Sequence, residues 1–206
     1  MAAHSSEIEQ AVAALKEGEL VVFPTETFYG IAADPFSEKA LEKLIAIKGR
    51  DPQKPIALIA ADASMAFEVA REVSPAARIL AKAFWPGPLT IVMPAREGIS
   101  AALIGPDRGV GIRVSPHPAA RALSDSLGHP ITATSANLSG EEPATTVQMA
   151  RASLGDRIKI FLDGGRLHAA APSTVISCDR AGYRVIRTGA ISERDIITAL
   201  SEGTLQ

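Results

Sequence analysis

Short apolar runs alternate with helical patterns along almost the whole chain, and few fold classes accommodate this alternation. The runs are four or five residues long and end at Pro, Gly or polar residues, which is typical of buried strands. Strands are predicted at 20–23, 56–60, 89–93, 110–114, 131–134, 159–163, 173–177 and 183–187. Helices are predicted between Ser6 and Gly18, with Ser6 and Glu9 as a capping box, from Ser37 to Ile47, at 64–73, 75–84, 118–127 and 146–154, and after Ser192.

The connections between these elements predict both kinds of strand pairing. Strands separated by a helix favour parallel pairing, whereas 173–177 and 183–187 favour a hairpin with a four-residue turn at 179–182. We therefore expect an α/β (α+β mixed) fold with a mixed parallel and antiparallel sheet and flanking helices. No linker, repeat or low-complexity tract divides the chain, so we expect one domain over 7–200 with terminal tails at 1–6 and 201–206.

The composition is that of an ordinary globular protein. The chain has 206 residues, of which 47% are hydrophobic, and a formal net charge of -2. Its single cysteine, Cys178, lies in an apolar run, so we expect a buried, unreactive thiol and a reducing compartment. No signal-peptide pattern or membrane-spanning run is visible. We expect a soluble, cytoplasmic protein.

Three cations gather in one turn of this slightly acidic chain. Lys48, Arg50 and Lys54 directly follow a helical pattern, and Gly49 and Pro55 prevent the helix from continuing. A guanidinium fork and two flexible ammonium groups on one turn can bind phosphate or carboxylate oxygens. A solvated charged loop is the alternative.

Two other segments are candidate ligand contacts. Arg113 interrupts the apolar strand 110–114, and a cation there must find water or an anion, so it either binds a ligand or forms a structural ion pair. Ser135 and Asn137 follow the strand 131–134, in a small, hydroxyl-rich loop that suits phosphate or ribose oxygens. A plain turn would also explain that loop.

Several familiar catalytic machineries have no counterpart in the sequence. Walker, Rossmann and nucleophile-elbow motifs are missing, and the four histidines lack metal-binding spacing, so no protein metal site is expected. His117, between two prolines, is interpreted as a structural turn residue. The recurring polar side chains are Thr27, Lys48, Arg50, Lys54, Arg113, Ser135, Asn137, Ser173 and Arg187. Such a set suits catalysis by positioning and charge stabilisation on a phosphate-bearing substrate.

Eight motifs taken together carry a resemblance to a known family. In order they are Pro24-Thr-Glu-Thr-Phe-Tyr-Gly30, Lys48-Gly-Arg50 with Lys54-Pro55, Phe84-Trp-Pro-Gly-Pro-Leu-Thr90, Arg113-Val-Ser-Pro-His-Pro118, Ser135-Ala-Asn137, Asp163-Gly-Gly165, Ser173-Thr-Val175 and Arg187. Over about residues 7–200 the chain resembles the YrdC/TsaC family of threonylcarbamoyl-AMP synthases. The resemblance implies a twisted α/β sheet with a concave, positively charged face.

The resemblance also implies an activity. Family members combine L-threonine, bicarbonate and ATP, with Mg²⁺ accompanying the ATP, into threonylcarbamoyl-adenylate and pyrophosphate. A downstream threonylcarbamoyl transferase uses the adenylate to modify tRNA, and weak binding of RNA would be compatible with the basic face. We expect a nucleotidyltransferase of this kind.

Site residues follow from the same resemblance. It implies that Thr27, Arg113, the backbone near Ala133, and Ser173 hold threonine, and that Arg50, Lys54, Ser135, Asn137 and Arg187 contact ATP. Lys48 and Arg50 are expected to be catalytic, with Lys48 neutralising carbamate or phosphate charge. Ile59 stands where some relatives have a His that contacts threonine, and the C-terminal domain of the long family members is not expected here.

Two other functions compete with the synthase. A non-catalytic double-stranded RNA or tRNA-binding module could use the same basic face, although only 4% of the residues are aromatic, which disfavours base stacking. A carbamoyl-transfer domain like that of hydrogenase maturation proteins would ordinarily accompany zinc motifs and an acylphosphatase-like region, which this sequence lacks.

Overall fold

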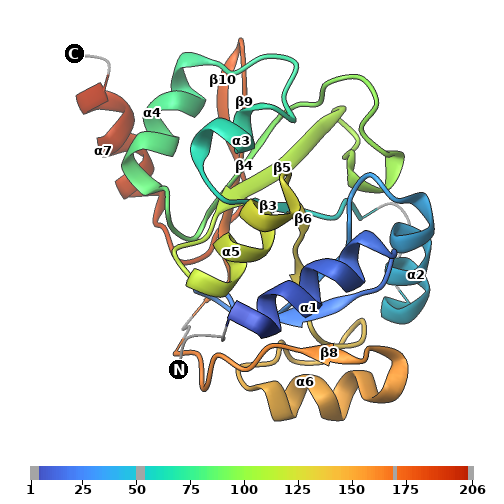
Figure 1. Cartoon of the computed structure of the whole chain (residues 1–206). Coiled ribbons are helices and arrows are strands. Elements are labelled where there is room, and N and C mark those ends of the chain that lie inside the picture. Colours follow the sequence, from blue (N-terminus) through green and yellow to red (C-terminus); the bar gives the residue numbers. More distant parts are fainter. Residues whose placement is uncertain (1–4, 50–53, 169–170, 204–206) are drawn as a thin grey trace.

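The computed structural model describes residues 5–49, 54–168 and 171–203 (Figure 1). The helices are α1 (Ser5–Lys16), α2 (Glu38–Lys48), α3 (Ala63–Phe67), α4 (Pro75–Phe84), α5 (Pro118–Leu127), α6 (Val147–Leu154) and α7 (Glu193–Gly203), with short 3₁₀ helices at Ala101–Leu103 and Gly155–Arg157. The strands are β1 (Val21–Phe23), β2 (Gly30–Ala32), β3 (Leu58–Ala60), β4 (Leu89–Pro94), β5 (Gly109–Val114), β6 (Ile131–Thr132), β7 (Thr134–Ser135), β8 (Ile160–Phe161), β9 (Thr174–Asp179) and β10 (Gly182–Arg187).

The strands form two mixed sheets. The larger sheet has the order β10-β9-β4-β5-β3-β6, and the smaller has the order β7-β2-β1-β8. Parallel pairs (β4 with β9, β3 with β5) stand beside antiparallel pairs (β4 with β5, β9 with β10) in the larger sheet. The expected mixed α/β fold is therefore confirmed.

The apolar strands β1 and β3 are buried on both faces, which explains their continuous hydrophobic runs. Along β1, Val21 and Phe23 pack into a cluster with α1 and α5, whereas Val22 points into the larger core between the sheets and other helices. Ile59 and its neighbours in β3 divide in the same way. Side chains alternate with a period of two along a strand, so each short strand supports both clusters.

Capping residues begin and end several helices at the positions that the sequence predicts. The Ser37 side chain accepts a hydrogen bond from Ala40 N at the start of α2, and Gly49 ends this helix in the left-handed region at φ 55°. His117 is the N-cap of α5, where its Nδ1 accepts from Ala119 N at 3.2 Å. The structural role predicted for His117 is confirmed, although the residue caps a helix and does not lie in a turn.

Four local predictions were wrong in detail. The helix expected at 64–73 ends at Phe67, because the following backbone bonds to the end of β4, with Arg71 N donating to Pro94 O at 2.8 Å. The β9–β10 turn has two central residues, since Asp179 pairs with Gly182. Ser6 lies inside α1, so it forms no capping box with Glu9.

The fourth correction concerns the strand expected at 131–134. It is divided between the two sheets: β6 pairs with β3 and β7 pairs with β2, a strand that the sequence did not predict. Between them, Ala133 N donates to Ala57 O at 2.8 Å. This crossing from one sheet to the other brings the loop after β7 to the same cavity as β5 and β9.

Cys178 confirms the expectation of a buried thiol. It is 1% exposed in the core, and burial, with a smaller contribution from Asp179, raises its pKa to about 12. The thiolate is therefore disfavoured at neutral pH.

Candidate functional site

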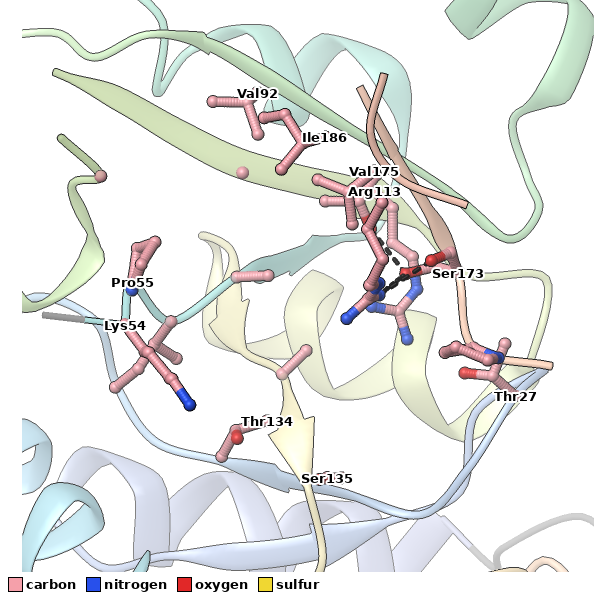
Figure 2. A pocket seen from close by; sticks show the side chains of 18 of the residues that line it. Thr27, Lys54, Pro55, Val92, Arg113, Thr134, Ser135, Ser173, Val175 and Ile186 are labelled. Carbon is pink, nitrogen blue, oxygen red and sulfur yellow. Dashed lines mark hydrogen bonds between the residues drawn. The ribbon is translucent and has the colours of Figure 1, made fainter. Parts of the chain in front are cut away.

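A cavity of about 850 Å³ opens where the two sheets meet (Figure 2). It is lined by the β1–β2 loop, the segment before β3, residues of β4 and β5, the crossing from β6 to β7, and the β9–β10 hairpin with the residues that precede it. In Figure 2, Lys54 extends from one side of the cavity and Thr27 lies on the other. Segments far apart in sequence therefore present polar side chains to one space.

Seven of the ten predicted site residues line this cavity. They are Thr27, Lys54, Arg113, Ala133, Ser135, Ser173 and Arg187. Lys48 and Asn137 are described but do not belong to the lining, and Arg50 lies outside the residues that the structure describes.

Lys48 is a buried cation that holds the loop after β7. It is 5% exposed, and its Nζ donates to Ser135 O at 2.7 Å, to Asn137 Oδ1 at 3.2 Å and to Asn137 O. The helix end places it there, since Lys48 is the last residue of α2 before the Gly49 cap. These bonds give Lys48 a structural role, and its expected contact with carbamate or phosphate stays a prediction.

Asn137 completes the same loop. Its Nδ2 donates to Glu141 O at 2.6 Å and its backbone N donates to Ser135 O at 3.0 Å. Asn137 therefore supports Ser135, which does line the cavity, and its expected contact with ATP stays a prediction.

Arg113 forms a nearly buried ion pair with Glu26. Arg113 Nε donates to Glu26 Oε1 at 2.8 Å, and the Ser115 hydroxyl donates to Glu26 Oε2. Burial opposes ionisation of Glu26 and is the largest single influence on its pKa, but the charge of Arg113 and the hydrogen bonds to Ser115, to the backbone and to Arg113 together lower the pKa. Of the two roles considered for Arg113, the ion pair is present, and the side chain also reaches the cavity.

Arg187 and Ser173 form a second polar group on the same wall. Arg187 donates to Ser173 O at 2.8 Å and to Ser173 Oγ at 3.2 Å, and Ser173 Oγ shares a hydrogen bond of 3.0 Å with Thr90. Partial removal from water lowers the pKa of Arg187, and the nearby charge of Arg113 lowers it further. Arginine is a cationic side chain, so the two neighbouring guanidinium groups together favour an anionic ligand.

The β1–β2 loop is held in shape by its own hydroxyls and by a distant glycine turn. Thr25 Oγ1 donates to Phe28 O at 2.7 Å and accepts from Thr27 N at 3.1 Å. Tyr29 Oη donates to Gly165 O at 2.7 Å and accepts from Gly164 N at 2.9 Å. The Asp163-Gly-Gly165 turn thus supports the loop that presents Thr27.

The sequence interpretation missed several members of this site. Glu26 was part of a recognised motif but received no role, and its position between two threonines beside a strand end was the available signal. Thr90, Asp107 and Arg184 also line the cavity. Arg184 had no signal of its own, because it is one of two arginines in an ordinary strand pattern.

The described part of the chain offers neither a metal cluster nor a membrane-spanning helix. Residues 5–49, 54–168 and 171–203 contain no group of three or more His, Cys, Asp or Glu side chains that could hold a metal ion. None of their helices combines the length and apolar character that a membrane span requires.

Comparisons with known proteins agree on one family. The model of the Sua5/YciO/YrdC family, described as "Telomere recombination", matches residues 13–189. The chain is 37% identical over 171 residues to a threonylcarbamoyl-AMP synthase of Idiomarina loihiensis, covering 82% of this chain and 91% of that protein. It is 42% identical over 161 residues to a threonylcarbamoyl-AMP synthase of Vibrio vulnificus, covering 77% of this chain and 87% of that protein.

A solved structure shows the same fold. It is the crystal structure of P. abyssi Sua5 complexed with L-threonine, which matches with a TM-score of 0.89 at 33% identity. The match covers 95% of this chain but 57% of that one.

Proposed function

Because the chain belongs to the Sua5/YciO/YrdC family, we propose that it is an enzyme that makes threonylcarbamoyl-AMP and pyrophosphate from L-threonine, bicarbonate and ATP. The observation that carries the proposal is the convergence of Arg113 and Arg187 with Thr27, Ser135 and Ser173 on one cavity. Relatives at 37% and 42% identity bear the name of this activity. The cavity is large enough for a nucleotide and a small amino acid together.

The chemistry requires charge compensation more than a protein nucleophile. The product joins a carbamate oxygen of carboxylated threonine to the α-phosphorus of ATP, and pyrophosphate leaves. Carboxylate, carbamate and triphosphate are all anionic and would repel one another without cations. Arg113, Arg187 and Lys54 supply positive charge on the cavity wall, so the reaction can proceed by positioning and electrostatic stabilisation.

Threonine is assigned to the end of the cavity formed by the β1–β2 loop. Arg113 pairs with the amino acid carboxylate, while Thr27, Ser173 and the backbone near Ala133 contact the rest of the molecule. P. abyssi Sua5, which shares this fold, was crystallised as a complex with L-threonine, and this supports the assignment. Glu26 holds Arg113 from behind through Nε.

ATP is assigned to Lys54, Ser135 and Arg187, with Arg50 as a further contact outside the described residues. Lys48 and Asn137 serve this site by fixing the backbone of Ser135. Asp107 is the one carboxylate side chain among the described lining residues. A lining with so few carboxylates fits a Mg²⁺ ion that is held mainly by the ATP phosphates, as is usual for this cation. Mg²⁺ would supply additional positive charge to the phosphates.

We further propose that a threonylcarbamoyl transferase that modifies tRNA consumes the adenylate, and that the reaction takes place in the cytoplasm. The comparisons support this catalytic function and not the alternative of a non-catalytic RNA-binding module. If the basic face were only an RNA platform, RNA affinity would be strong and would fall steeply with salt. We expect weak RNA binding with a shallow salt dependence.

The test is to incubate the protein with ATP, Mg²⁺, bicarbonate and labelled threonine, and to look for labelled threonylcarbamoyl-AMP. Pyrophosphate release should require all three substrates. Equal ATP turnover without threonine would refute the proposal.

A further inference from the structure

The last strand, β10, presents Arg184 as well as Arg187 to the cavity, because its pairing with β9 is irregular. Arg184 pairs with Ser177 and Val185 with Ile176, but Arg187 pairs with Val175, so one residue of β10 between them has no partner in β9. Residues directly opposite each other in an antiparallel pair share a face of the sheet. Arg184 and Arg187 therefore share the face of Ser177 and Val175, whereas Val185 shares the core face of Ile176.

Without this bulge the two arginines would point in opposite directions, because a spacing of three residues reverses the face of a regular strand. With it, both line the cavity. Their partners in β9 are two residues apart, which corresponds to roughly 7 Å along the strand. Two guanidinium groups at this spacing can contact different phosphates of one triphosphate.

In this structure Arg184 forms an ion pair with Asp107. Its Nη2 donates to Asp107 Oδ2 at 2.6 Å, and the two side chains are 65% and 71% exposed. An ion pair so open to water contributes little to stability and is readily exchanged for another anion. Asp107 is also the single acidic residue among the described residues of the lining, so Arg184 is paired there with an exposed carboxylate that a phosphate group could replace.

The turn that presents Asp107 lies at the Lys54 side of the cavity. Gly105 N donates to Gly109 O at 2.8 Å and Arg108 N donates to Gly105 O at 2.9 Å, which fixes the turn around Asp107. A Cβ atom on Gly105 would lie 3.5 Å from Pro55 Cγ, so the turn lies close to the residue after Lys54. Arg184 and Lys54 thus approach the cavity beside the same turn.

We propose that Arg184 binds the β- or γ-phosphate of ATP and exchanges the Asp107 carboxylate for it. The inference rests on the proposed function and adds a residue to its triphosphate site. Asp107 then acts as a counter-ion that occupies Arg184 until the nucleotide arrives.

Calorimetric titration with ATP and with AMP tests this assignment, because AMP lacks the outer phosphates. In Arg184→Ala, ATP affinity should fall about tenfold while AMP affinity stays unchanged. Arg180→Ala is the matched control: Arg180 lies at the turn before the same strand, pairs with Glu72 in an exposed ion pair, and is outside the cavity lining. It should bind both nucleotides as the unchanged protein does.

Asp107→Asn tests the exchange itself. This variant should bind ATP at least as tightly as the unchanged protein, since it removes the competing carboxylate. A loss of ATP affinity as large as that of Arg184→Ala would overturn the exchange, and equal losses of ATP and AMP affinity in Arg184→Ala would overturn the phosphate contact. If the unchanged protein binds no ATP, the proposed function itself is wrong. If the unchanged protein binds ATP and Arg184→Ala binds ATP equally well, only the inference about Arg184 is wrong.

Discussion

Arg113 Nε lies 2.8 Å from Glu26 Oε1, and these two side chains are only 8% and 10% exposed. The pair joins the strand β5 to the β1–β2 loop, two walls of one cavity. Both charges have lost most of their water, so each depends on the other and on Ser115 for compensation. The orientation of Arg113 toward the cavity is therefore set by a carboxylate behind it.

Replacing Glu26 by Gln should reduce both stability and threonine affinity. The variant leaves the Arg113 charge nearly buried without a counter-ion, at a cost of about 3 kcal/mol, which corresponds to a fall in Tm of roughly 6–12 °C for a chain of this length. Thermal unfolding and threonine titration measure the two effects. Glu72→Gln, which removes an acid from the exposed pair with Arg180, is the control and should change neither.

The Glu26 carboxylate should also make the protein sensitive to acid. Its pKa is lowered from an ordinary value of 4.5 in the folded state. The stability that it contributes is fully present above that ordinary value and is lost as the pH falls through the lowered one, since the unfolded chain binds the proton more readily. Unfolding free energies of the unchanged protein and Glu26→Gln, compared from about pH 6 to about pH 2, should converge at the acidic end. A constant difference across this range would contradict the prediction.

Arg113→Lys should weaken threonine binding selectively. Lysine keeps the charge but loses the planar fork that can serve Glu26 and a substrate carboxylate at once, so we expect a loss of about 1–3 kcal/mol of threonine binding with nearly constant ATP affinity. Thermal stability should fall as well, because the ion pair with Glu26 is disturbed. Separate threonine and ATP titrations decide the role: equal losses for both ligands indicate a purely structural arginine, and unchanged threonine affinity removes Arg113 from the site.

Lys48→Met should destabilise the protein and weaken ATP binding together. The substitution deprives the carbonyl groups of Ser135 and Asn137 of a charged donor, at a cost of about 2–4 kcal/mol, and releases the backbone that presents Ser135. Thermal unfolding and ATP titration should change in parallel. Lys43→Met, on the same helix in a half-exposed pair with Glu19, should change neither. Loss of synthase activity with normal Tm and normal ATP affinity would instead support the direct catalytic role that the sequence predicts for Lys48.

Local chemistry was enough to predict most helices and strands. Pro118 and Gly128 bound α5 because a proline suits the first turn of a helix and a glycine suits the left-handed residue after it, here at φ 84°. The apolar runs predicted strands for a different local reason. In β1 and β3, for example, a continuous apolar run reflects burial of the strand on both faces. Motifs in a fixed order then indicated the family, and seven of the predicted residues line one cavity.

Side-chain partners were beyond the reach of such signals. Lys48 and Ser135 are 87 residues apart in sequence, as are Glu26 and Arg113, and no local pattern relates the members of either pair. The sequence by itself determined the elements and the kind of chemistry, because propensity, capping and apolar periodicity act over a few residues. Only the tertiary structure decided which cations face the cavity and which hold the backbone, because a buried charge takes its partner from whatever distant segment the packing places within hydrogen-bond distance.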